Sequence, residues 1–104
     1  MTARLVLTTA GSPDEADRLA RTLVEERLAA CVNILPGMRS VYRWRDAVQS
    51  AGEVLLLIKT QENALGALRA RISALHSYEL PEFLVLDVAA GSPAYLDWIA
   101  ASVG

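Results

Sequence analysis

Apolar and polar positions in the first quarter of the chain predict a strand followed by a helix. Residues 4–9 are mostly β-branched or apolar and are followed by Ala10-Gly11, which is typical of a buried strand that stops there. Residues 12–15 form a helix start, because Ser12 can cap the first amides and Glu15 can reach back to the cap. A helix ending near residue 28 is therefore expected, with these apolar positions: Ala16, Leu19, Ala20 and Leu23.

The middle of the chain has the pattern of a long hairpin. Residues 30–44 are extended in character, and Pro36-Gly37 predicts a bulge or bend within that strand. A polar stretch with small residues, 45–52, precedes the strongly apolar residues 54–58. We expect two long antiparallel strands whose arm could reach a neighbouring subunit.

The second half repeats the order of helix and strand. Apolar residues at spacings of three, four and three predict a second helix, which Pro81 cannot continue. Residues 83–88 then indicate another strand, and Ser92-Pro93 begins a short C-terminal helix. The apolar stripe of the second helix consists of Leu65, Leu68, Ile72 and Leu75.

This order of elements predicts one α+β domain over residues 1–104. A strand, helix, strand, strand, helix, strand sequence with right-handed crossovers gives the ferredoxin-like arrangement, βαββαβ, followed here by a terminal helix. The expected sheet is antiparallel and carries its helices on one face.

Composition adds an oligomer to this picture. The chain has 104 residues, of which 53% are hydrophobic, and a single small core cannot hide so many. The longest strongly apolar run, residues 54–58, is far short of the roughly 20 residues that a membrane helix needs. No secretory signal is visible, and the lone Cys31 cannot form an internal disulfide. We expect a cytoplasmic protein with a buried subunit interface and no membrane partner.

Charge gives no sign of nucleic-acid binding. Ten basic and twelve acidic residues give a formal charge of −2 and are spread along the chain. The local basic concentration consists of Arg39, Arg43 and Arg45, which alternate in an extended segment. This spacing predicts one shared strand face, and a solvated face is favoured over an anion site.

Few residues can carry chemistry. A dyad of Cys31 and His76 is arithmetically possible, but Cys31 lies in an apolar string that favours a buried cysteine, and glycine-rich phosphate loops are absent. We therefore predict no enzyme and no standard cofactor. His76 stands at a predicted helix end close to Glu79 and Glu82, where it is either a structural group or a ligand of a borderline metal. Because such a metal needs three or four ligands, a trimer could supply the rest across a subunit boundary.

Five strings in register resemble the CutA family and cover nearly the whole chain. They are Thr8-Thr9-Ala10 before Pro13, the hallmark-like segment 28–37 continued by Ser40, Tyr42 and Trp44, then 53–60, then His76-Ser77-Tyr78-Glu79-Leu80-Pro81-Glu82, and Tyr95-Leu96-Asp97-Trp98-Ile99. The resemblance implies a ferredoxin-like protomer in a tight homotrimer similar to the PII signalling proteins. It further implies a role in tolerance to divalent cations, with copper binding reported for some members.

The resemblance also suggests metal ligands. The ligands proposed in that family are a cysteine late in the first strand and histidines just before the Tyr-Glu-x-Pro-Glu motif. This chain has Thr8 and Leu75 at two of those positions and matches only at His76. Cys31 matches another family cysteine. The predicted divalent metal is copper, and its predicted ligands are His76, Cys31, Glu79 and Glu82.

Two other functions follow from the same residues. One is a PII-like signalling or scaffold trimer that binds a small anion or an unidentified protein partner in a cleft between subunits. That cleft would use Arg39, Tyr42, Arg43, Trp44, Lys59 and Tyr78. The other is an enzyme of the dimeric α+β barrel type, which shares the fold class.

Overall fold

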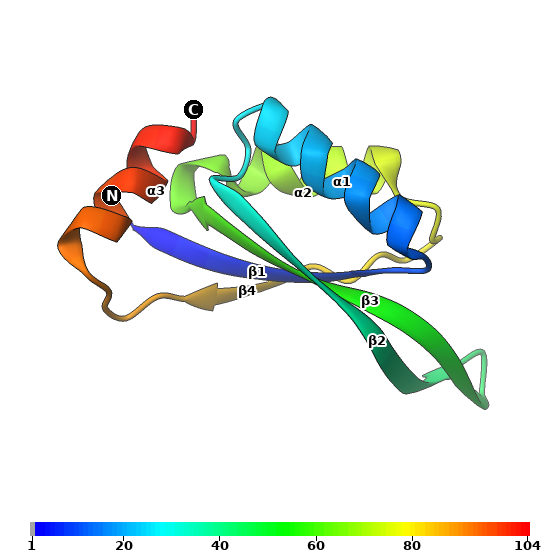
Figure 1. Ribbon diagram of the computed structural model, residues 1–104. Helices are drawn as coiled ribbons and strands as arrows, with labels where there is room; N and C mark the ends of the chain where they lie inside the picture. The colour runs from blue at the N-terminus through cyan, green and yellow to red at the C-terminus, as the bar shows by residue number, and fades with distance from the viewer. Residues whose placement is uncertain (1) are drawn as a thin grey trace.

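The computed structural model describes residues 2–104 and shows a four-stranded sheet with helices (Figure 1). The elements in chain order are β1 (Ala3–Ala10), α1 (Pro13–Glu25), β2 (Cys31–Trp44), β3 (Ala47–Gln61), α2 (Leu65–Leu75), β4 (Leu84–Asp87) and α3 (Pro93–Ser102), with a short 3₁₀ turn at Glu62–Ala64. The sheet order is β2-β3-β1-β4, and every neighbouring pair is antiparallel. The predicted βαββαβ order with a terminal helix is confirmed.

The core lies between the sheet and helices α1 and α2, which cover one face (Figure 1). Val6 of β1 and the alternate residues Leu56 and Ile58 in the second half of β3 are fully buried there. Helix α1 ends three residues earlier than predicted, because Arg27 turns the chain with a φ of 59°. The stripe of α2 is also shorter than expected, since its last residue, Leu75, remains 38% exposed.

The opposite face of the sheet is largely bare of helices. Leu5 and Leu7 of β1 pair directly with Leu86 and Leu84 of β4, so all four side chains share that face. Leu84 is 56% exposed and Leu86 is 43% exposed. Helix α3 lies at one end of the sheet, where Ile99 packs against Ala3 and Ala30. One chain therefore leaves a continuous apolar surface in water.

Strands β2 and β3 continue beyond the sheet as an arm (Figure 1). A register shift between Leu35 and Met38 marks the predicted break at Pro36-Gly37, and Gly37 has a φ of 79°. Residues 47–52, expected as a polar connection, instead belong to β3, because the hairpin turns in only two residues, Arg45 and Asp46. Their φ values of 51° and 65° are those that a type I′ turn requires.

Glu15 joins the start of α1 to the segment that follows α2. The hydroxyl of Ser12 accepts a hydrogen bond from the amide of Glu15, as the predicted cap requires. The carboxylate of Glu15 in turn accepts hydrogen bonds from the amides of Gly11 and Ser77, at 3.2 and 2.9 Å. Burial opposes the charge, but these hydrogen bonds outweigh it, so the pKa of Glu15 is lowered from its ordinary value of 4.5. The segment 76–83 is thus fastened to the end of β1.

Replacing Asp46 by glycine should stabilise the arm. Residues with a Cβ are strained at positive φ by about 1–2 kcal/mol, whereas glycine is not, and part of that gain is offset by the freedom of glycine in the unfolded chain. We expect Asp46→Gly to raise the denaturation midpoint, measured in guanidinium chloride. The control Gln49→Gly, in the extended part of β3, should lower it. A lower midpoint for Asp46→Gly would contradict this account of the turn.

Replacing Glu15 by glutamine should cost about 1–3 kcal/mol at neutral pH, because two buried amides lose a charged acceptor. The folded-state pKa is depressed, so the stabilisation is complete above the unfolded value of 4.5 and is lost as pH falls through the folded value. Urea unfolding of the wild type and of Glu15→Gln at neutral and acidic pH measures the difference in their free energies of unfolding. That difference should shrink in acid, whereas the exposed control Glu25→Gln should show no change with pH. An equal difference at both pH values would refute the ionic role of Glu15.

Candidate functional site

His76 is sealed inside the protomer and both of its ring nitrogens are engaged. Its side chain has no exposed surface. Nε2 donates to the carbonyl oxygen of Thr9 at 2.6 Å, and Nδ1 accepts the amide of Tyr78 at 3.0 Å. This network assigns the proton to Nε2. Within one chain both nitrogens are already occupied by protein groups, and the role of His76 as a metal ligand stays a prediction.

A half-buried group of acids lies next to His76. The hydroxyl of Tyr78 donates to Glu53 at 2.8 Å. Burial raises the pKa of Tyr78, and the neighbouring Glu53 raises it further, so the phenol keeps its proton. The pKa of Glu82 is also raised, first by burial and then by the charge of Glu53. Two carboxylates thus share a partly desolvated environment beside a phenol.

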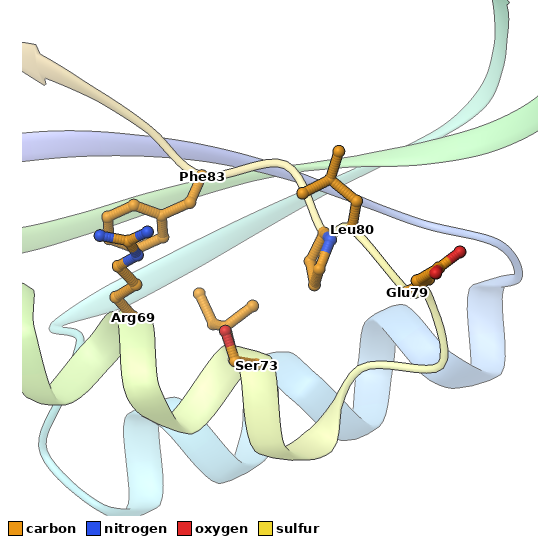
Figure 2. Close-up of a pocket in the computed structure, with 7 residues that line it drawn as sticks. Arg69, Ser73, Glu79, Leu80 and Phe83 are labelled. Atoms are coloured by element: carbon orange, nitrogen blue, oxygen red, sulfur yellow. The ribbon is translucent and has the colours of Figure 1, made fainter. Parts of the chain in front are cut away.

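The predicted ligand Glu79 pairs with a residue of the hairpin turn. Its carboxylate forms an ion pair with Arg45 at 2.9 Å, and both side chains are at least 70% exposed. Glu79 also lines a pocket of about 480 Å³. In Figure 2 it lies at one end of this pocket, and Arg69 and Ser73 of α2 lie opposite Leu80 and Phe83. Arg45 belongs to the hairpin turn and forms its ion pair with Glu79. The prediction that it shares one strand face with Arg39 and Arg43 is therefore wrong for Arg45.

Cys31 lies toward the other end of the sheet. Cys31 of β2 pairs with Lys59 of β3, and Lys59 in turn pairs with Leu5 of β1. His76 instead contacts Thr9, which is four residues further along β1, or about 13 Å at 3.3 Å per residue. Cys31 is only partly buried, which corrects the expectation of a core cysteine. Cys31 and His76 therefore form neither a dyad nor a metal site within one chain.

The residues predicted to line a cleft are divided between two regions. Lys59 lies beside α3, where a hydrogen bond to the hydroxyl of Tyr95 at 3.2 Å raises its pKa. The others lie on the arm or by its root: Arg39, Tyr42, Arg43, Trp44 and Tyr78. Arg39 bonds to Ser50 at 2.7 Å. Strand alternation places Arg39 and Arg43 on one face of the arm and the two aromatic residues, Tyr42 and Trp44, on the other.

Within residues 2–104, no group of three or more His, Cys, Asp or Glu residues is placed to hold a metal ion. The four predicted ligands are therefore not assembled by one chain. Sequence reasoning gave Glu53 no role, although this residue opens one of the strings that resemble the CutA family. Its contact with Tyr78 spans 25 residues, and no local pattern could have indicated it.

Comparison with known proteins gives one consistent family. The family described as CutA1 divalent ion tolerance protein matches residues 4–102. The divalent-cation tolerance protein CutA of Thermus thermophilus is 48% identical over 100 residues, which are 96% of this chain and 97% of that protein. The chloroplastic protein CutA of Arabidopsis thaliana is 43% identical over 91% of this chain, which spans 52% of that longer protein.

Solved structures agree with the sequence comparison. The divalent cation tolerance protein CutA1 from Thermus thermophilus superimposes with a TM-score of 0.96 at 47% identity, covering 98% of this chain and 99% of that one. The residues that match the family span β1 from its second residue and every later helix and strand in full, so the match is not confined to one motif. The chain belongs to the CutA1 divalent-ion tolerance family.

Proposed function

We propose that this chain acts as a homotrimer that binds a divalent cation and serves in tolerance to metal ions. The observation that carries the proposal is the bare apolar sheet face, together with a half-buried pair of carboxylates that one chain does not complete as a metal site. The tolerance role follows the printed names of the relatives.

Assembly is supported by the exposed apolar residues of the sheet and arm. Leu84 and Leu86 are about half exposed on the bare face, while Val41 and Val48 on the arm are 71% and 68% exposed. Strands β2 and β4 form the two edges of the sheet, and unpaired edges are templates for pairing with another chain. Three copies joined through these edges would bury the surface that the helices leave open.

The cation site would be built from oxygen. Glu53 and Glu82 are close enough for the charge of one to raise the pKa of the other, and a divalent cation would remove that repulsion. A second subunit would supply the remaining ligands. Carboxylates suit hard or borderline divalent cations, whereas softer ligands favour Cu(I). Copper as the metal is therefore supported by the family resemblance more than by the groups in place.

No helix of the described chain is long and apolar enough to cross a membrane. A cytoplasmic location is part of the proposal, and it is supported by the absence of paired cysteines. The Arabidopsis relative is named as chloroplastic, so family membership alone does not fix the compartment.

Wild-type protein should have a mass of three chains of 11.2 kDa by light scattering at micromolar concentration. Leu86→Glu should release monomers, because it places a charge in the proposed interface. Val24→Glu is the matched control, since Val24 is 42% exposed on α1 and Leu86 is 43% exposed. A wild-type monomer, or a Leu86→Glu trimer, would overturn the assembly.

Glu82→Gln should raise the melting temperature of EDTA-treated protein by a few degrees, because it removes a desolvated charge beside Glu53. It should also abolish the further rise that added Mn²⁺, Zn²⁺ or Cu²⁺ gives the wild type. Glu25→Gln, on the exposed side of α1, should behave as wild type in both respects.

His76→Gln separates the two candidate sites. We expect this variant to melt earlier and still to gain stability from cations, since the imidazole holds the segment in place without binding metal. Calorimetric titration of Cu²⁺ into both variants would decide. Loss of binding in His76→Gln with normal binding in Glu82→Gln would move the site to the imidazole.

A further inference from the structure

The pocket between α2 and the segment 76–83 has one polar and one apolar wall. Its volume of about 480 Å³ falls within the range of about 300–1,000 Å³ that is typical of small-molecule sites. Arg69 and Ser73 stand one turn apart on the same face of α2. In Figure 2 their side chains lie opposite Leu80 and Phe83. A molecule in this pocket would therefore contact polar groups on one side and apolar groups on the other.

The polar wall is accessible to a ligand. Arg69 is exposed and has no ion pair within residues 2–104, whereas Arg71 of the same helix pairs with Glu26 at 2.8 Å. Ser73 is exposed as well. A carboxylate matches these two side chains, because a guanidinium can donate to both carboxylate oxygens and a hydroxyl can donate one further hydrogen bond.

The apolar wall can hold a ring. Leu80 is 71% exposed, so most of its side chain is available for contact. Phe83 is partly buried and packs against the core cluster beneath α2, which holds its ring in place. Aromatic rings pair favourably in offset or edge-to-face arrangements, and apolar surface covered by a ligand is removed from water. A flat, compact apolar body is therefore the part of a ligand that suits this wall.

The charges at the two ends of the pocket favour a single negative charge on the ligand. Glu79 and Arg69 lie at opposite ends in Figure 2. The carboxylate of Glu79 already pairs with Arg45 in solvent, so it has little need of a cation from a ligand. It would still repel a second anionic group placed near it. A ligand that carries one carboxylate, directed toward Arg69, avoids this repulsion.

We propose that this pocket binds small aromatic monocarboxylates, with Arg69 holding the carboxylate and with Leu80 and Phe83 contacting the ring. Helix α2 lies on the covered face of the sheet, so burial of the bare face in the proposed trimer leaves the pocket accessible (Figure 1). The residues that line it include neither Glu53 nor Glu82, so the site is separate from the proposed cation site.

Benzoate is a suitable probe, and its binding to the wild-type protein can be followed by the NMR chemical shifts of the amides of residues 69–83 at constant ionic strength. A ligand of this size should bind with a Kd in about the millimolar range. Benzamide keeps the ring without the charge, and acetate keeps the charge without the ring. Each should bind at least about tenfold more weakly, because each loses the contact with one wall.

Two variants separate the roles of the charge and of the pocket. Arg69→Gln should weaken benzoate binding at least about tenfold and leave the weak binding of benzamide unchanged. Ser73→Phe keeps Arg69 but fills the pocket, so it should abolish binding of both molecules. Both positions are exposed, so neither change disturbs the core. Arg18→Gln is the matched control, since Arg18 is an exposed arginine of α1 outside the pocket, and it should bind benzoate as the wild type does.

The proposal is overturned by any of four results. These are no measurable binding of benzoate to the wild type at tens of millimolar, equal affinity for benzoate and benzamide, full benzoate affinity in Arg69→Gln, or full benzoate affinity in Ser73→Phe. The last result would show that a surface arginine binds the anion without a pocket. Arg69→Gln should keep the wild-type response to cations, so a failure of this proposal is distinguishable from a failure of the cation site.

Discussion

A sheet that its own helices cover on one face only is the constraint on which the rest of this structure depends. Two helices are sufficient to bury Val6 of β1 and the alternate residues Val54, Leu56 and Ile58 of β3, and this builds the core. The odd-numbered leucines point the other way and are left to water in a single chain. The hydrophobic effect then favours any arrangement that removes this second surface from solvent. On the proposed assembly, other copies provide that cover for a chain in which 53% of the residues are hydrophobic.

The segment after α2 shows how a short polar network can position a site without belonging to it. Glu15 and His76 together satisfy the amides of Gly11, Ser77 and Tyr78 and the carbonyl of Thr9. These bonds join the end of β1, the start of α1 and the approach to β4. With the backbone fixed in this way, the phenol of Tyr78 reaches Glu53 on the arm root. His76, the predicted metal ligand, is thus also part of the network that holds this segment.

Much of the fold could be predicted from the sequence because its signals are local. Ser12 and Pro13 define a helix start, helical spacing identified α2, and Pro36-Gly37 marked the bulge. The turn was less visible, since Arg45 and Asp46 are unusual at positive φ, and the polar residues after them resembled a loop. The site depended on distant contacts. Neither the pairing of Arg45 with Glu79 nor the meeting of Tyr78 with Glu53 has a signature in the spacing of residues.

Strand β3 has a consequence for how this family can vary in sequence. Val54, Leu56 and Ile58 face the helices, while Leu55 and Leu57 face the bare side. On the proposed assembly, neighbouring residues of β3 are therefore under different selective pressures. The residues that face the helices are selected for folding of the chain, and those on the bare side are selected for contact between chains. The apolar run 54–58 would then contain two sets of residues, one that packs the core and one that contacts other chains. Homologues could change the second set, and so their quaternary contacts, while leaving the tertiary core untouched.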